Sequence, residues 1–289
     1  MGISGWDVAA VFAKAVTYAA TFGAAGAVFF LLYGGTLLRD PQRGLTRRLI
    51  AIFVGVAAVA SLLRIQLLAG SMSGDAAGMF NTTFAGMILG AGEGRAGGVR
   101  IVGLALILFA LSKNPLFRGP AILGAIAAST SFAWVGHIHA LVPNTVPSLL
   151  LCLHLLCAAF WLGALPPLLI IATGAHEPQI AAAAARFGKL ALRVVALLIA
   201  AGASLLLMLI GSAGQFWASD YGRMMAIKLL AVAALLSLAA WNKLALTPRL
   251  LQGDTRAMVN FRRSLLAEMS VGALILLATA AFTTLTGPP

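Results

Sequence analysis

Residues 129–167 read STSFAWVGHIHALVPNTVPSLLLCLHLLCAAFWLGALPP and contain both cysteines of the chain, Cys152 and Cys157. The same stretch holds His137, His139 and His154, while most of its other side chains are apolar. Its second part, about residues 149–171, is a nearly unbroken apolar run, and about 20 such residues suffice for a helix to cross a bilayer. The stretch therefore predicts a membrane-spanning helix that carries potential metal ligands next to a histidine-bearing loop.

The composition extends this prediction to the whole chain. Of its 289 residues, 61% are hydrophobic and only 10% are charged, whereas soluble domains carry about a quarter charged residues. Apolar runs of about 20 residues recur along the sequence without the strict alternation of a transmembrane barrel. We therefore expect an all-α fold, a polytopic membrane bundle of eight transmembrane helices in the lipid bilayer, with residues 1–289 forming a single integral membrane domain.

The apolar runs define the expected helices. They cover about residues 8–38, 49–68, 99–111, 121–135, 149–171, 224–241 and 264–285. The sixth helix of the eight continues from the basic segment 173–193 to about residue 210. The segment 79–90, MFNTTFAGMILG, is too short and too polar to span the bilayer. We expect it to be re-entrant or interfacial.

The basic residues predict the orientation. The formal charge of +12 does not indicate nucleic-acid binding, because most Lys and Arg residues lie between apolar runs, after the first, third, fifth and seventh helices. The positive-inside rule makes these loops cytoplasmic, so both termini face outward. His137 and His139 then lie outside and His154 lies in the outer third of its helix. The start of the chain lacks a basic segment with a cleavage site, so we expect the first helix to be retained.

A short internal similarity predicts a repeat. GRAGGVR, from Gly94, resembles GRMMAIK, from Gly222, so that Arg100 corresponds to Lys228 at one constant offset. Two groups of four helices have the same orientation in the membrane, which predicts a 4+4 parallel repeat with halves of about 1–140 and 141–289.

Helical geometry separates the two cysteines. At about 100° per residue, His154, Cys157 and Trp161 share one face of their helix, whereas Cys152 lies roughly 160° from His154. Imidazole and sulfur ligands favour copper, which makes His154 and Cys157 candidate metal ligands. In the alternative interpretation Cys157 is a small packing residue and His154 hydrogen-bonds a neighbouring helix.

His137 and His139 form a second candidate ligand pair. In an extended segment their rings point the same way, which suits a two-ligand metal clamp at an exposed mouth. Incidental histidines in a solvated loop are the alternative. With His154 nearby, the sequence favours capture of the metal at the loop and handover to the helix.

Further polar side chains fall within the apolar runs. Lys228 and Glu268 are candidates for a pathway or for structural support, as are Trp161 and Met224. We expect Lys228 and Glu268 to lie at different depths and not to pair. Arg64 and Arg100 are expected to snorkel to the outer surface.

Several motifs resemble the copper resistance protein D family (CopD or PcoD). They are LHLLCAAFWLGALPPLL from Leu153, YGRMMAIKLL from Tyr221, RRSLLAEMSVGALILL from Arg262, and Gly136–His137 after the fourth helix. The resemblance implies an eight-helix protein of the bacterial inner membrane that takes up copper and works with a periplasmic CopC-like copper-binding protein. It places His137, His154, Trp161, Gly163 and Glu268 at the family's motif positions. No CopC-like domain is fused within these residues.

Three functions are compatible with these features. The first is a permease that imports copper, as Cu(I) or Cu(II), without a P-loop for ATP and without enzymatic activity. The second is a haem-binding electron-transfer protein in which the same histidines are axial ligands. The third is a structural or assembly membrane protein that binds no metal.

Overall fold

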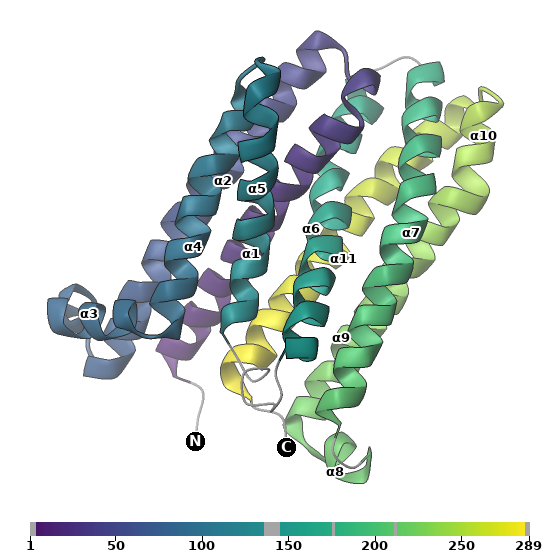
Figure 1. Ribbon diagram of the computed structural model, residues 1–289. Helices are drawn as coiled ribbons and strands as arrows, with labels where there is room; N and C mark the ends of the chain where they lie inside the picture. Colours follow the sequence, from purple (N-terminus) through teal and green to yellow (C-terminus); the bar gives the residue numbers. More distant parts are fainter. Residues whose placement is uncertain (1–3, 136–144, 175–176, 211–212, 287–289) are drawn as a thin grey trace.

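A computed structural model describes residues 4–135, 145–174, 177–210 and 213–286, and every element within these ranges is a helix (Figure 1). Eight helices are long and apolar enough to cross a membrane, which confirms the predicted all-α bundle. The spans are built on α1 (Gly5–Tyr33), α2 (Asp40–Ser73), α4 (Gly92–Ile107), α5 (Arg118–Thr130), α6 (Thr145–Gly174), α7 (Glu177–Leu209), α9 (Asp220–Trp241) and α11 (Thr255–Leu285).

Short helices connect or extend the spans. The 3₁₀ helices η3 (Leu108–Leu111) and η5 (Ser131–Trp134) lengthen α4 and α5, and a π-helix, η7 (Asn242–Leu246), joins α9 to α10 (Thr247–Leu251). The others are η1 (Gly35–Leu37), η2 (Ala77–Phe80), α3 (Thr82–Gly90), η4 (Pro115–Phe117) and α8 (Ala213–Ala218). The segment predicted not to span forms η2 and the nine-residue α3.

Several helices are longer than their apolar runs. The basic segment expected to be a loop before residue 49 is helical, because α2 already begins at Asp40, with Pro41 in its first turn. Helix α11 begins at Thr255, where the side chain of Asp254 accepts hydrogen bonds from the backbone N–H groups of Arg256 and Ala257. Hydropathy detects only the part of a helix inside the hydrocarbon, whereas the backbone hydrogen bonds continue into the interface.

Helix α1 occupies the centre of the bundle, where it packs against α2, α4, α5, α6 and α11. By contrast, α7 packs mainly against α6 and α10, and α9 packs mainly against α11. The first described turn of α1 and the last turn of α11 lie at the same end of the bundle, together with α3 and α8 (Figure 1). The loop between α9 and α11, with α10, lies at the opposite end.

Small residues allow α1 and α6 to approach at backbone distance. A Cβ atom on Gly26 would lie 2.2 Å from the carbonyl oxygen of Ala159, and one on Gly163 would lie 2.1 Å from that of Phe22. Such close approach is how membrane helices gain packing energy without a hydrophobic driving force. The α6 helix remains continuous through Pro166 and Pro167, four residues beyond this crossing.

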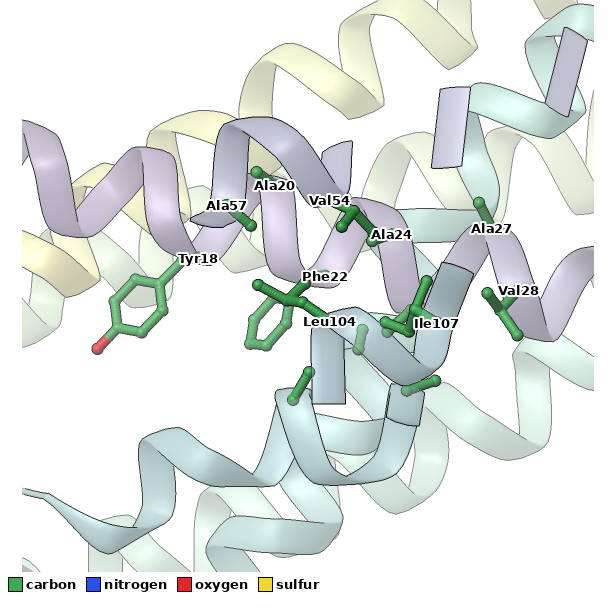
Figure 2. Close-up of a cluster of buried hydrophobic side chains, with 14 of the residues drawn as sticks. Tyr18, Ala20, Phe22, Ala24, Ala27, Val28, Val54, Ala57, Leu104 and Ile107 are labelled. Atoms are coloured by element: carbon green, nitrogen blue, oxygen red, sulfur yellow. The ribbon is translucent and has the colours of Figure 1, made fainter. Parts of the chain in front are cut away.

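The core of the N-terminal half is an apolar cluster around α1 (Figure 2). Phe22 and Ala24 of α1 are buried together with Val54 of α2 and with Leu104 and Ile107 of α4. Alanine side chains fill much of the remaining space, which keeps the helices close.

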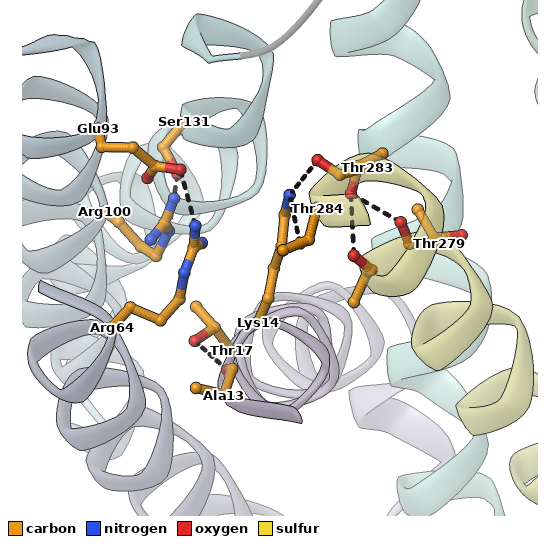
Figure 3. Close-up of polar contacts among 11 residues, drawn as sticks. Ala13, Lys14, Thr17, Arg64, Glu93, Arg100, Ser131, Thr279, Thr283 and Thr284 are labelled. Carbon is orange, nitrogen blue, oxygen red and sulfur yellow. Dashed lines mark hydrogen bonds and ion pairs between the residues drawn. The ribbon is translucent and has the colours of Figure 1, made fainter. Parts of the chain in front are cut away.

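The prediction that Arg64 and Arg100 snorkel to the surface is wrong, because both are buried (Figure 3). A guanidinium N–H of Arg64 donates to Glu93 at 2.7 Å, and Nε of Arg100 donates to the hydroxyl of Ser131 at 3.1 Å. The Arg100 guanidinium also lies 4.0 Å from the centre of the Phe132 ring. These partners inside the bundle replace water for both side chains.

Candidate metal-transfer site

His154 lies where α6 packs against α7. Its Nδ1 is 3.1 Å from the backbone carbonyl oxygen of Leu198. Gly202, one turn further along α7, makes room for the ring, since a Cβ atom there would lie 2.9 Å from Cε1 of His154. The backbone carbonyl of Leu198 and the space left by Gly202, both on α7, together fix the position of the imidazole.

This contact determines the tautomer of His154. A carbonyl oxygen can only accept a hydrogen bond, so Nδ1 carries the proton and donates it to Leu198. The lone pair of the neutral ring then lies on Nε2. Metal-binding histidines commonly donate their other ring nitrogen to a backbone carbonyl in this way.

Cys157 and Trp161 follow His154 along α6, at the spacing that places them on its face. The side chains of both are buried, whereas Cys152 is half-buried. Both cysteines are free thiols. A buried thiol one turn from an oriented imidazole places a soft ligand atom near His154.

Lys228 and Met224 belong to α9. The ammonium group of Lys228 lies 5.3 Å from the centre of the Phe282 ring. Met224 packs at the edge of an aromatic cluster that contains Phe216, Tyr221 and Phe282. Lys228 thus has an aromatic partner rather than a carboxylate, in agreement with its predicted separation from Glu268.

Trp161 and Glu268 line one cavity of about 500 Å³. The cavity lies among α6, α7, α9, η7 and α11, and most of its lining side chains are apolar. Two turns of α6, about 10 Å of rise, separate Trp161 from His154. Trp161 and Glu268, both singled out from the sequence, therefore line the same cavity in the half of the bundle opposite the chain ends.

Glu268 has a partner that the sequence did not suggest. The side-chain amide of Asn242, the first residue of the π-helix η7, donates to the carboxylate of Glu268. The amide oxygen of Asn242 is buried and has no hydrogen-bond partner among the described residues. In the sequence, Asn242 could have been noticed as a polar residue at the end of an apolar run. π-Helical segments also occur frequently at functional sites.

The remaining candidate ligands, His137 and His139, fall within residues 136–144, outside the described residues. Among the residues that the structure describes, no three His, Cys, Asp or Glu side chains are grouped closely enough to hold a metal ion. If His154 and Cys157 were metal ligands, a three-coordinate site would require a further ligand from elsewhere.

The fold and these interior polar groups define a polytopic helical membrane protein with ionisable side chains inside its bundle. Two family models match the chain: Copper resistance protein D-like, N-terminal domain, over residues 5–141, and Copper resistance protein D, over residues 181–282. The chain belongs to the copper resistance protein D family, a family of copper-handling membrane proteins. Comparisons with curated proteins and with solved structures found no significant match.

The two matched segments leave residues 142–180 uncovered. This interval contains α6, with His154, Cys157 and Trp161. The family match therefore establishes the class of protein and its link to copper, and the roles of these side chains depend on their geometry.

Proposed function

We propose that the protein is a permease that carries copper inward across the bacterial inner membrane. Copper is its substrate. His137 and His139 capture the ion at the outer mouth and pass it to His154 and Cys157 within the bundle. Both termini are periplasmic in this proposal, as the distribution of basic residues predicts.

The orientation of His154 is the observation that carries the proposal. The bond from Nδ1 to Leu198 leaves the lone pair of Nε2 available, and Cys157 adds sulfur one turn away. Together these atoms favour a soft ion such as Cu(I). A histidine that served only to join α6 to α7 would need no soft ligand beside it.

The charge of Lys228 suits passage rather than storage. A fixed positive charge inside the bundle opposes the accumulation of further positive charge near it. Conduction requires a site that binds an ion strongly enough to admit it and weakly enough to release it. Lys228 lowers the affinity of a site that two strong ligands would otherwise make too tight.

The cavity beside Trp161 provides the next step towards the cytoplasm. Its polar end is formed by Glu268 and Asn242, whose carboxylate and amide oxygens attract cations. The ion leaves the soft ligands of His154 and Cys157 and passes these harder oxygen atoms on its way inward. A membrane potential adds about 2.3 kcal/mol per charge per 100 mV to this inward movement.

The proposal includes delivery of copper by a protein partner. In the proposal a periplasmic CopC-like copper-binding protein presents its ion to His137 and His139. Mixing a copper-loaded CopC-like protein with the purified chain should move copper to the chain, and His137→Ala/His139→Ala should slow this transfer. Transfer at an unchanged rate in that variant would remove the two histidines from the capture step.

Isotopic copper uptake into proteoliposomes tests the permease. We expect uptake by the wild type, accelerated by a potential that is negative inside, and a loss of at least about tenfold in His154→Ala, the equivalent of about 1.4 kcal/mol. Uptake no faster than in protein-free liposomes would refute the permease. A Soret band in the purified protein would instead favour the haem-binding alternative.

The two cysteines form a matched pair of variants on one helix. Cys157→Ala should weaken Cu(I) binding, because it removes the sulfur on the His154 face of α6. Cys152→Ala should leave binding unchanged, since its side chain lies on a different face. Competition with a chromophoric Cu(I) chelator measures both affinities. Equal affinities in the two variants would exclude Cys157 as a ligand.

A further inference from the structure

A second cavity, which has a polar wall, lies far from His154. It is at the end of the N-terminal half opposite the chain ends. It measures about 250 Å³ and is enclosed by the last turn of α1, the start of α2, η3 and the start of α5. Four basic side chains line it: Arg43, Arg47, Lys113 and Arg118. None of its described lining residues is acidic.

Local hydrogen bonds hold one of these basic groups and the loop that carries two others. Nε of Arg47 donates to the carbonyl oxygen of Ala110 at 3.3 Å, which ties α2 to η3. Asn114 accepts from the backbone N–H of Leu116 at 3.0 Å and so orders the loop between Lys113 and Arg118. The nearest carboxylate in an ion pair, that of Asp40 with Arg43 at 3.6 Å, is almost fully exposed.

The other wall of the cavity is apolar. Leu31, Leu32 and Phe109 line it beside the basic groups. Leu116 and Phe117, in the adjoining η4, expose their side chains, and the Phe117 ring stacks on Phe109 with ring centres 5.0 Å apart. A ligand of this cavity must therefore carry negative charge on one part and tolerate an apolar surface next to it.

We propose that this cavity binds the phosphate group of an anionic phospholipid from the cytoplasmic leaflet. The phosphate lies among the four basic side chains, and the acyl chains run along the exposed apolar side chains of η4. Basic pockets between helices on the cytoplasmic side are suited to lipid headgroups. The distribution of Lys and Arg places this end of the bundle in the cytoplasmic leaflet.

Phosphatidylglycerol titrated into phosphatidylcholine-containing detergent micelles tests the site, with thermal stabilisation of the full chain as the readout. Arg47→Gln/Arg118→Gln should weaken binding roughly 30-fold, since each basic group contributes about a fivefold factor. Arg48→Gln/Arg249→Gln is the matched control. It removes the same charge from exposed positions at the same end, outside the cavity, and should bind as the wild type does.

Should the double variant fail to fold, Lys113→Gln replaces it, because this side chain is exposed and should cost only about fivefold. Equal losses in the cavity variant and the control would overturn the proposal, since generic attraction would then explain binding. The proposal would also be overturned if the wild type showed no preference for phosphatidylglycerol over phosphatidylcholine. Stabilisation by millimolar inorganic phosphate without any lipid effect would overturn the lipid assignment and indicate a soluble ligand.

Discussion

Two arginines show how single side chains are accommodated at membrane depth. Arg64 is paired with Glu93, whereas Arg100 relies on the hydroxyl of Ser131 and on the ring of Phe132. Charges inside a membrane protein are expensive unless such partners are present. The partners of Arg100 come from a different helix, about thirty residues away, so the sequence alone did not reveal them.

Glu93→Gln should destabilise the protein, because it leaves the buried guanidinium of Arg64 without its counter-charge. We expect a loss of about 1–3 kcal/mol in the free energy of unfolding, measured in mixed micelles with a denaturing detergent. Asp220→Asn is the control, since it breaks an ion pair with Arg223 in which both side chains are more than two-thirds exposed. Its cost should stay below about 0.5 kcal/mol, and equal effects would contradict a role for Glu93 as the counter-charge of the buried Arg64.

At the scale of helices, the crossing of α1 and α6 determines the positions of His154 and of the cavity lined by Trp161 and Glu268. Gly26 and Gly163 set its distance, because each faces the backbone of the other helix. The existence of both helices follows from hydropathy. The rotation of one helix relative to the other does not follow from hydropathy, since small residues occur on several faces of each helix. The contact of His154 with Leu198 depends on the same rotation between α6 and α7, and therefore appeared only in the structure.

Gly163→Ala tests this crossing. The added methyl group would meet the backbone of α1 and force the helices apart, at a cost of about 1–3 kcal/mol. Gly55→Ala in α2 is the matched control, because its added methyl group meets nothing within 4 Å. It should be neutral or stabilise the helix by up to about 1 kcal/mol. Unfolding in mixed micelles compares the two, and equal stability would mean that α1 and α6 can separate freely.

For the whole molecule, the eight spans were predictable because each contains its own apolar run. The ends of the helices were less predictable from the sequence, as the extension of α2 back to Asp40 shows. The 4+4 repeat stays a prediction. Two contacts agree with it: Arg100 lies over Phe132 and Lys228 lies over Phe282, with each cation on the third span of a half and each ring in the fourth.

Cysteine labelling tests the orientation of the whole bundle. In a Cys152→Ala/Cys157→Ala background, Asp75→Cys, at the end of α2, should react with a membrane-impermeant maleimide in intact spheroplasts. Gln252→Cys, between α10 and α11, should react only after the membrane is opened, because the basic residues around it predict a cytoplasmic position. The reverse pattern would invert the bundle and with it the proposed direction of transport.

The central position of α1 has a consequence for biogenesis. Of the eight spans in this sequence it is synthesised first, yet its neighbours include α6 and α11, which leave the ribosome much later. Lys14 of α1 donates to the carbonyl oxygen of Thr283 near the end of α11. Until that last helix inserts, the ammonium group of Lys14 lacks this acceptor and must be shielded by the insertion machinery or by lipid headgroups. Assembly of the eight-span bundle is thus completed only after α11 has been inserted.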